Sequence, residues 1–78
     1  MINWATLNDN TRFIDIDLGL RRVCVILNDK TKTGAMRIRD METKTITDYM
    51  LTLEQYERFA IHKMSYEEAE ALVLERME

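Results

Sequence analysis

The chain of 78 residues contains no proline, only two glycines, one cysteine and one histidine. The single cysteine, Cys24, cannot form a disulfide within the chain. The single histidine, His62, excludes a two-histidine metal site, and two separated glycines exclude a glycine-rich phosphate-binding loop. We therefore expect no catalytic residues, no cofactor and no bound metal, and we predict that the protein is not an enzyme.

Long apolar runs are also missing, and none approaches the roughly 20 residues that cross a bilayer. The N-terminal residues 1–4 have neither the basic nor the apolar region of a signal peptide. Cys24 lies in the apolar run from Val23 to Leu27 and is expected to be a buried, reduced thiol. These features predict a cytoplasmic protein that does not associate with membranes. From the Met1 start and the absence of proline, we expect a complete reading frame without linkers.

The size and composition of the chain predict a single folded domain over residues 1–78, since 46% of the residues are hydrophobic and 32% are charged. A chain of this length buries only about 60% of its unfolded surface, so its stability margin is thin. Without a disulfide or a metal site, oligomerisation is the remaining common means of stabilising so small a chain. We expect a homodimer, or a chain that is bound to another protein.

The character of the chain changes near residue 51, from a β-rich part over residues 1–51 to a helical part over residues 52–78. The helical part contains two capping boxes, in which a hydroxyl accepts from the N3 amide while the N3 side chain reaches back. They are Thr52-Leu53-Glu54-Gln55 and Ser65-Tyr66-Glu67-Glu68. These signatures and the apolar periodicity that follows them predict helices over 53–61 and 66–77.

The β-rich part contains four segments with the alternation or β-branched content of strands, at residues 12–17, 20–27, 35–41 and 44–51. The second segment is apolar on both faces toward its end, which predicts a central strand that is buried on both sides there. Residues 1–10 end in the turn cluster Asn8-Asp9-Asn10 and are not assigned to a strand. The predicted fold class is α+β, a four-stranded antiparallel sheet followed by two C-terminal helices.

Two groups of side chains on the predicted sheet could bind a ligand. Asp15 and Asp17 project from one strand face and could hold Mg²⁺, but no further acidic residue has a distinctive spacing. A solvated face, in which one of the two pairs with a cross-strand arginine, is the preferred interpretation. The second group surrounds an aromatic ring with basic residues that could follow a single-stranded nucleic acid, or form a plain surface of mixed charge. Its members are Arg37, Arg39, Lys44 and Tyr49.

The segment Leu51-Thr52-Leu53-Glu54-Gln55-Tyr56, placed after the last of four strands, resembles the helix start of the small transcriptional coactivators that bind single-stranded DNA. The resemblance covers residues 12–60. It implies dimerisation through the helix and binding of single strands on the sheet. The chain departs from that family at Met41-Glu42-Thr43-Lys44, where the family has a Lys/Gly-rich segment, and in its second acidic helix.

Charge divides the chain, because residues 1–50 carry eight Lys/Arg and seven Asp/Glu, whereas residues 51–78 carry three and seven. The second helix could occupy a basic groove of a partner with its carboxylates Glu67, Glu68, Glu70 and Glu75. Small inhibitor proteins of phage and mobile elements, including anti-CRISPR and other anti-defence proteins, have a similar form. We expect a non-catalytic protein-interaction module of this inhibitor type that binds a larger host protein or nucleoprotein complex. The alternative is a single-stranded nucleic-acid-binding protein.

Overall fold

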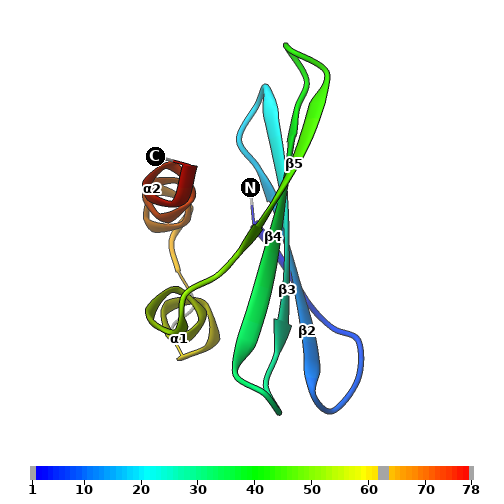
Figure 1. Cartoon of the computed structure of the whole chain (residues 1–78), viewed down its shortest axis with the longest axis vertical. Helices are drawn as coiled ribbons and strands as arrows, with labels where there is room; N and C mark the ends of the chain where they lie inside the picture. The colour runs from blue at the N-terminus through cyan, green and yellow to red at the C-terminus, as the bar shows by residue number, and fades with distance from the viewer. Residues whose placement is uncertain (1, 62–63, 78) are drawn as a thin grey trace.

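The computed structural model describes residues 2–61 and 64–77, so His62, Lys63 and the two terminal residues lie outside the description below. The described chain has two layers, an antiparallel sheet and a pair of helices that lie on one of its faces (Figure 1). The strands are β1 (Ile2–Thr6), β2 (Thr11–Asp17), β3 (Arg21–Asn28), β4 (Thr33–Asp40) and β5 (Thr45–Met50). Their order in the sheet follows their order in the chain, so every neighbouring pair forms a hairpin.

The sheet has five strands, and the prediction of four was wrong because it left out β1. This strand pairs with β2 along its whole length, with Ile2 opposite Ile16 and Trp4 opposite Ile14. Only Ile2 and Trp4 give it an apolar alternation, which is too short to identify a strand from the sequence. The turn at Asn8 was predicted, and the amide of Leu7 closes it by donating to the carbonyl of Thr11 at 2.9 Å.

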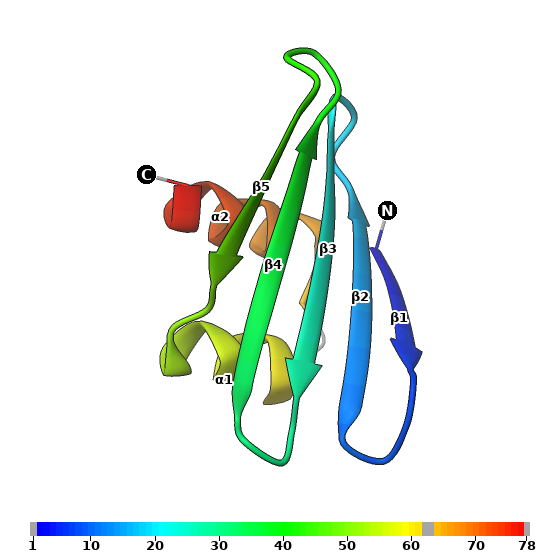
Figure 2. The same cartoon turned by 45° about the vertical axis from the view of Figure 1, so that its right-hand side comes forward.

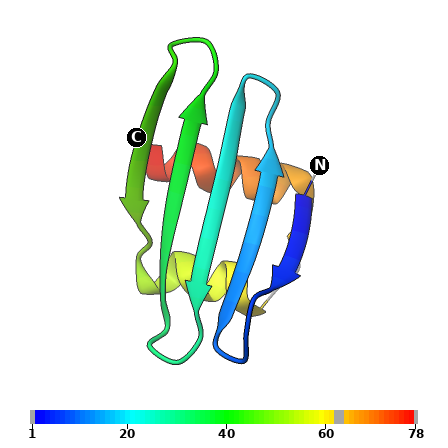
Figure 3. The same ribbon diagram turned by 90° about the vertical axis from the view of Figure 1, so that its right-hand side faces the viewer.

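The helices α1 (Leu53–Ile61) and α2 (Tyr66–Met77) have the predicted bounds. Both predicted capping boxes are confirmed. The amide of Gln55 donates to Thr52 Oγ1 at 3.1 Å, and the amide of Thr52 donates to Gln55 Oε1 at 3.0 Å. The second box forms in the same way between Ser65 and Glu68. Figures 2 and 3 show that both helices run across the strands, with α1 and α2 near opposite ends of the sheet.

The hydrophobic core lies between the sheet and the helix layer, a name used here for α1 and α2 together. Strand positions alternate between core and solvent, and Ile14 and Ile16 of β2 are fully buried. From the helices, Tyr56 and Phe59 of α1 pack against the same cluster as Leu72 of α2. The other buried apolar members are Val23, Val25, Leu27, Met36, Ile38, Met64, Ala69 and Val73.

The opposite face of the sheet is covered by no element of the described chain, and we call it the open face (Figure 3). This corrects the prediction for β3, which is indeed the central strand but is buried on one side only. Ile26 on its second side is 44% exposed, and Cys24 is half-buried. The reason is that both helices follow the sheet in the chain and pack on the same face.

The β3–β4 and β4–β5 hairpins share a turn design. Asn28 and Asp40 each accept from two amides of their own turn, at 2.9–3.2 Å. Four residues later, Lys32 and Lys44 both have φ of +56°, a left-handed conformation that is costly for residues with a Cβ. Thr33 and Thr45 complete the pattern through hydroxyl contacts with Thr31 and Thr43, respectively, both at 2.7 Å. Lys44 therefore has a conformational role in its turn.

Candidate interaction surfaces

A network of three side chains fixes α1 to the sheet. Asp29, just after β3, accepts from Arg12 of β2 at 2.7 and 2.8 Å and from the Tyr56 hydroxyl of α1 at 2.6 Å. Arg12 also donates to the carbonyl of Ala60 at 2.9 Å, which satisfies a backbone acceptor near the end of the helix. These bonds bring together residues 17 to 48 positions apart.

The pKa values in this network follow from its geometry. The hydrogen bonds from Arg12 and then from Tyr56 lower the pKa of the Asp29 carboxyl. Burial raises the pKa of Tyr56, and its hydrogen bond to the Asp29 carboxylate raises it further. The hydrogen bond to Asp29 also raises the pKa of Arg12. All three side chains are therefore held in the protonation states that bind one another, which is the behaviour of a structural network.

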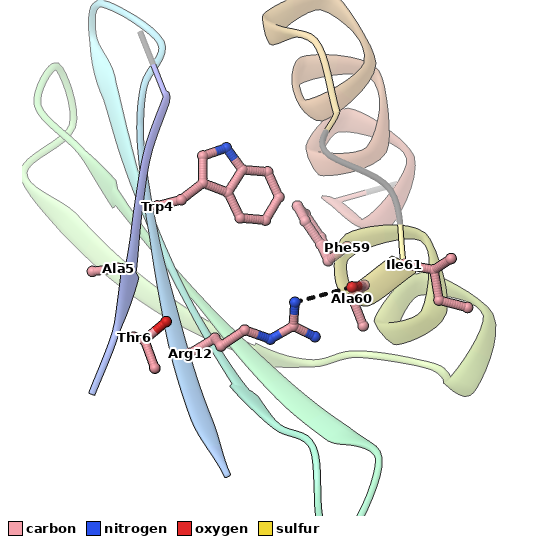
Figure 4. A pocket seen from close by; sticks show the side chains of 7 residues that line it. All are labelled: Trp4, Ala5, Thr6, Arg12, Phe59, Ala60 and Ile61. Carbon is pink, nitrogen blue, oxygen red and sulfur yellow. Dashed lines mark hydrogen bonds between the residues drawn. The ribbon is translucent and has the colours of Figure 1, made fainter. Parts of the chain in front are cut away.

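A hollow of about 370 Å³ lies beside this network, between the edge of the sheet at β1 and β2 and the end of α1 (Figure 4). Figure 4 shows the Trp4 ring extending toward Phe59 and the Arg12 guanidinium reaching the Ala60 carbonyl. The remaining lining residues are Ala5, Thr6 and Ile61. Among the described residues of this lining Arg12 is the only ionisable side chain, and it already binds Asp29 and Ala60, so these residues supply no acid–base pair.

The open face consists of rows of side chains that run across the strands, because the register places one residue of each strand opposite the next. One row, which we call the apolar row, crosses all five strands and consists of Ala5, Phe13, Ile26, Ala35 and Met50. The next row toward the β2–β3 turn consists of Asn3, Asp15, Cys24, Arg37 and Asp48. A third row consists of Asp17, Arg22, Arg39 and Ile46.

Opposite charges balance on the open face, where three arginines accompany three aspartates among the described strand residues. Arg37 binds Asp48 through two bonds of 2.8 and 3.1 Å, and Arg22 lies 3.6 Å from Asp17. The bond from Arg37 lowers the pKa of the Asp48 carboxyl. This mixed, solvated arrangement corresponds to the interpretation preferred for Asp15 and Asp17. The described residues contain no group of three or more His, Cys, Asp or Glu side chains that could hold a metal ion.

The structure separates the four residues of the predicted basic surface. Arg37 and Arg39 lie on the open face of β4, as expected. Tyr49 lies opposite the buried Met36, on the face that the helices cover, and the Arg76 guanidinium of α2 lies 5.3 Å from its ring centroid. Lys44 lies in the β4–β5 turn. In the described part of the chain, Tyr49 therefore lies on the other face of the sheet from Arg37, which instead binds the carboxylate of Asp48.

The outer side of the helix layer combines exposed apolar side chains with carboxylates. Leu53 and Ile61 of α1 are 59% and 67% exposed, and they line a shallow hollow of about 410 Å³ with Glu54, Glu57 and Arg58. The apolar periodicity of this segment predicts that Leu53 faces the core together with Tyr56 and Phe59, and for Leu53 this prediction is wrong because the side chain is 59% exposed. A signal was present, because Leu53, Glu57 and Ile61 recur every four residues on the side away from the core positions.

Of the four predicted acidic residues of α2, Glu75 is linked to this surface, whereas Glu70 lines a separate hollow with Leu18 and Asp40. Glu67, Glu68 and Glu75 are exposed and Glu70 is half-buried. Glu75 binds Arg58 of α1 at 3.2 Å, so the outer sides of the two helices are linked. Glu68 also serves in the capping box of its helix. The helices carry six glutamates and two arginines, whereas the open face is neutral, so the negative charge of the described chain is concentrated in the helix layer.

Comparison of the chain with protein-family models, with curated proteins and with solved structures gives no match. None of the described helices is long and apolar enough to cross a membrane. What the protein does is therefore inferred from its surfaces alone, and the resemblance to the single-stranded-DNA-binding coactivators stays a prediction.

Proposed function

We propose that the protein is a non-catalytic interaction module whose helix layer binds a basic surface of a larger host protein or nucleoprotein complex. The observation that carries this proposal is that Glu54 and Glu57 lie beside the exposed Leu53 and Ile61, in a helix layer with six glutamates and two arginines. Protein interfaces combine a small apolar centre with a polar rim, and complementary charge selects the partner and steers its approach. An inhibitor of phage or mobile-element type would use such a surface to occupy a site that normally holds nucleic acid.

The binding surface is held in place by contacts of α1 with the sheet and with α2. The bonds of Asp29 with Arg12 and Tyr56 fix α1 to the sheet, and the Arg58–Glu75 pair links α1 to α2. A partner would therefore meet a preorganised surface, which lowers the entropic cost of binding. The outer side chains Leu53, Glu57 and Ile61 contribute little to the core, so they are free to serve recognition.

The alternative, binding of single-stranded nucleic acid on the open face, has less support. Phosphate binding requires an excess of positive charge, and the three arginines of this face are matched by three aspartates. Base stacking requires an accessible ring, and Tyr49 faces the helices. Phe13 is the aromatic residue on the open face, and it is half-buried.

The proposal is tested by measuring binding to the captured partner with two variants that remove the same charge from different places. Glu54→Gln/Glu57→Gln removes two carboxylates from the proposed surface. The matched control, Asp9→Asn/Glu42→Gln, removes two from exposed turns of the sheet. We expect the first variant to bind at least about tenfold more weakly, a change of about 1.4 kcal/mol, and the control to bind like the wild type. If both variants weaken binding to the partner equally, the loss depends on net charge and not on the position of the carboxylates, and this result would contradict the proposal.

A further inference from the structure

We propose that two copies of the chain associate through their open faces, forming a symmetric dimer whose two-fold axis runs along β3. The helix layers then lie on the two outer sides. This inference is independent of the proposed function, because it concerns the other face of the sheet. The first observation that supports it is that the sequence and the burial of β3 disagree. The residues from Val23 to Leu27 have the pattern of a strand buried on both sides, but β3 is buried on one side only. In the isolated chain Ile26 is 44% exposed, and a second copy is what would bury it.

The apolar row favours association of the open face with the open face of a second copy. It crosses every strand without a charged residue, and its last member, Met50, is 65% exposed. An axis along β3 places β1 over β5 and β2 over β4 of the second copy. Each row then lies over the same row of the second copy. Ile26 then meets Ile26 of the second copy, and Phe13 meets Ala35. A large side chain therefore faces a small one on either side of a central apolar contact, as interdigitating sheets require.

The same axis matches opposite charges in the two neighbouring rows. Asp15 of β2 faces Arg37 of β4 in the second copy, and Asp17 faces Arg39. Because the arrangement is symmetric, each contact occurs twice. The exception is Arg22, which faces Arg22 of the second copy near the end of the sheet. There each Arg22 lies 3.6 Å from Asp17 of its own chain and is more than half exposed.

A two-fold axis at right angles to the strands gives no such match. If this axis follows the apolar row, the row meets itself, but the aspartates and arginines face the polar row of Thr11, Asn28 and Thr33. If it lies between the apolar row and the row of Cys24, apolar side chains face charged ones, which is costly. Of these three axes, the one along β3 places apolar side chains against apolar ones and aspartates against arginines, and this charge complementarity supports a second copy as the occupant.

The size of the face indicates a reversible dimer. Five strands about 4.8 Å apart, each with about six residues of about 3.3 Å, outline a face of roughly 500 Å², so two stacked faces bury roughly 1,000 Å². Specific interfaces of standard size bury about 1,200–2,000 Å², so this dimer belongs at the weak end of the range. We expect dissociation in the micromolar range, with monomer dominating in dilute solution.

The only cysteine in the sequence, Cys24, provides a direct probe because it lies on the proposed axis. Stacked sheets are about 10 Å apart, so the dimer encloses both thiols, whereas Cys24 is half-buried in the single chain. We expect a monofunctional maleimide to label Cys24 more slowly at concentrations above the dissociation constant, in proportion to the remaining fraction of monomer. An equal labelling rate at concentrations well above and well below the measured dissociation constant would overturn the proposal.

Two variants, measured by sedimentation equilibrium, test the interface itself. Ile26→Asp places two carboxylates against each other on the axis, and its matched control is Ile61→Asp, the same change at an exposed isoleucine of the helix layer. We expect Ile26→Asp to abolish the dimer and Ile61→Asp to leave it unchanged. A dimer that survives Ile26→Asp, or is lost in Ile61→Asp, would place the interface elsewhere and overturn the proposal.

A second variant keeps the proposal testable if Ile26→Asp is poorly folded. Arg39→Asp creates a like-charge contact with Asp17 of the second copy, whereas within its own chain it places a carboxylate opposite Arg22. The monomer should therefore keep or raise its melting temperature, while the dimer dissociation constant rises about tenfold or more. An unchanged dissociation constant in this folded variant would contradict the proposed charge match.

Discussion

The bond between Tyr56 and Asp29 gives a sharp test of how α1 is held, through the substitution Tyr56→Phe. This change removes one hydrogen bond of 2.6 Å to a carboxylate and keeps the ring in the core, where the residue is 6% exposed. A hydrogen bond to a charged group contributes about 1.5–3 kcal/mol, and the partial exposure of Asp29 reduces this to about 1–2 kcal/mol. For a chain of this length, such a loss lowers Tm by roughly 5–15 °C.

The assay is urea unfolding of the wild type, Tyr56→Phe, Asp29→Asn and the double variant. In the Asp29→Asn background the tyrosine hydroxyl faces a neutral amide, so the cost of Tyr56→Phe should fall by about 1 kcal/mol, which is the coupling energy of the pair. Tyr66→Phe is the matched control, because Tyr66 forms no side-chain hydrogen bond with any described residue. A cost of Tyr56→Phe equal to that of this control, or one that Asp29→Asn leaves unchanged, would refute the reasoning.

The same pair predicts a dependence on pH. Since the pKa of Asp29 is lowered in the folded chain, its contribution is complete above its unfolded value of about 3.9 and is lost as the pH falls through the folded value. Since the pKa of Tyr56 is raised, its contribution is complete below its unfolded value of about 10 and is lost as the pH rises through the folded value. Asp29→Asn should flatten the acid limb of the stability curve, and Tyr56→Phe the alkaline limb.

Three further substitutions have expected outcomes that thermal or urea unfolding checks. Lys44→Gly relieves a left-handed φ of +56° and should raise the free energy of unfolding by up to about 1 kcal/mol, whereas a loss of stability would show that the lysine side chain matters to the turn. Gly34→Ala places a Cβ 2.8 Å from Leu51 Cδ1 and 3.2 Å from the Ile26 carbonyl, so it should cost about 1–3 kcal/mol, and a neutral result would mean that the strand shifts freely there. Ser65→Ala removes the cap of α2 and should cost about 1 kcal/mol, a loss that Asp at the same position should largely prevent.

The helices could be predicted to the residue because their signals are local. Each capping box occupies four consecutive residues, and the bonds that it forms stay within the same turn. The repeated turn pattern was equally local but was missed. Asn28, Thr31, Lys32 and Thr33 recur twelve residues later as Asp40, Thr43, Lys44 and Thr45, and this repeat could have assigned Lys44 to a turn.

Features that depend on register or on distant contacts could not be predicted. Tyr49, Met50 and Leu51 are consecutive apolar residues, so alternation does not identify the face of Tyr49. The register of β4 and β5 decides it, because Arg37 lies opposite Asp48 and the buried Met36 therefore lies opposite Tyr49. The partners of Asp29 lie 17 and 27 residues away, and no local signal connects them. The coverage of a single face by both helices is likewise a matter of topology, and it determines which side of β3 is exposed.

The most direct test of the proposed function is an affinity capture from a lysate of the native host after nuclease treatment, read by mass spectrometry. Three chains are compared: the wild type, Ile61→Asp on the helix layer and Ile26→Asp on the open face. We predict one stoichiometric protein partner that survives nuclease, is retained by Ile26→Asp and is lost by Ile61→Asp. Capture of no protein partner after nuclease treatment, or of a protein partner that depends on Ile26 and not on Ile61, would contradict the account.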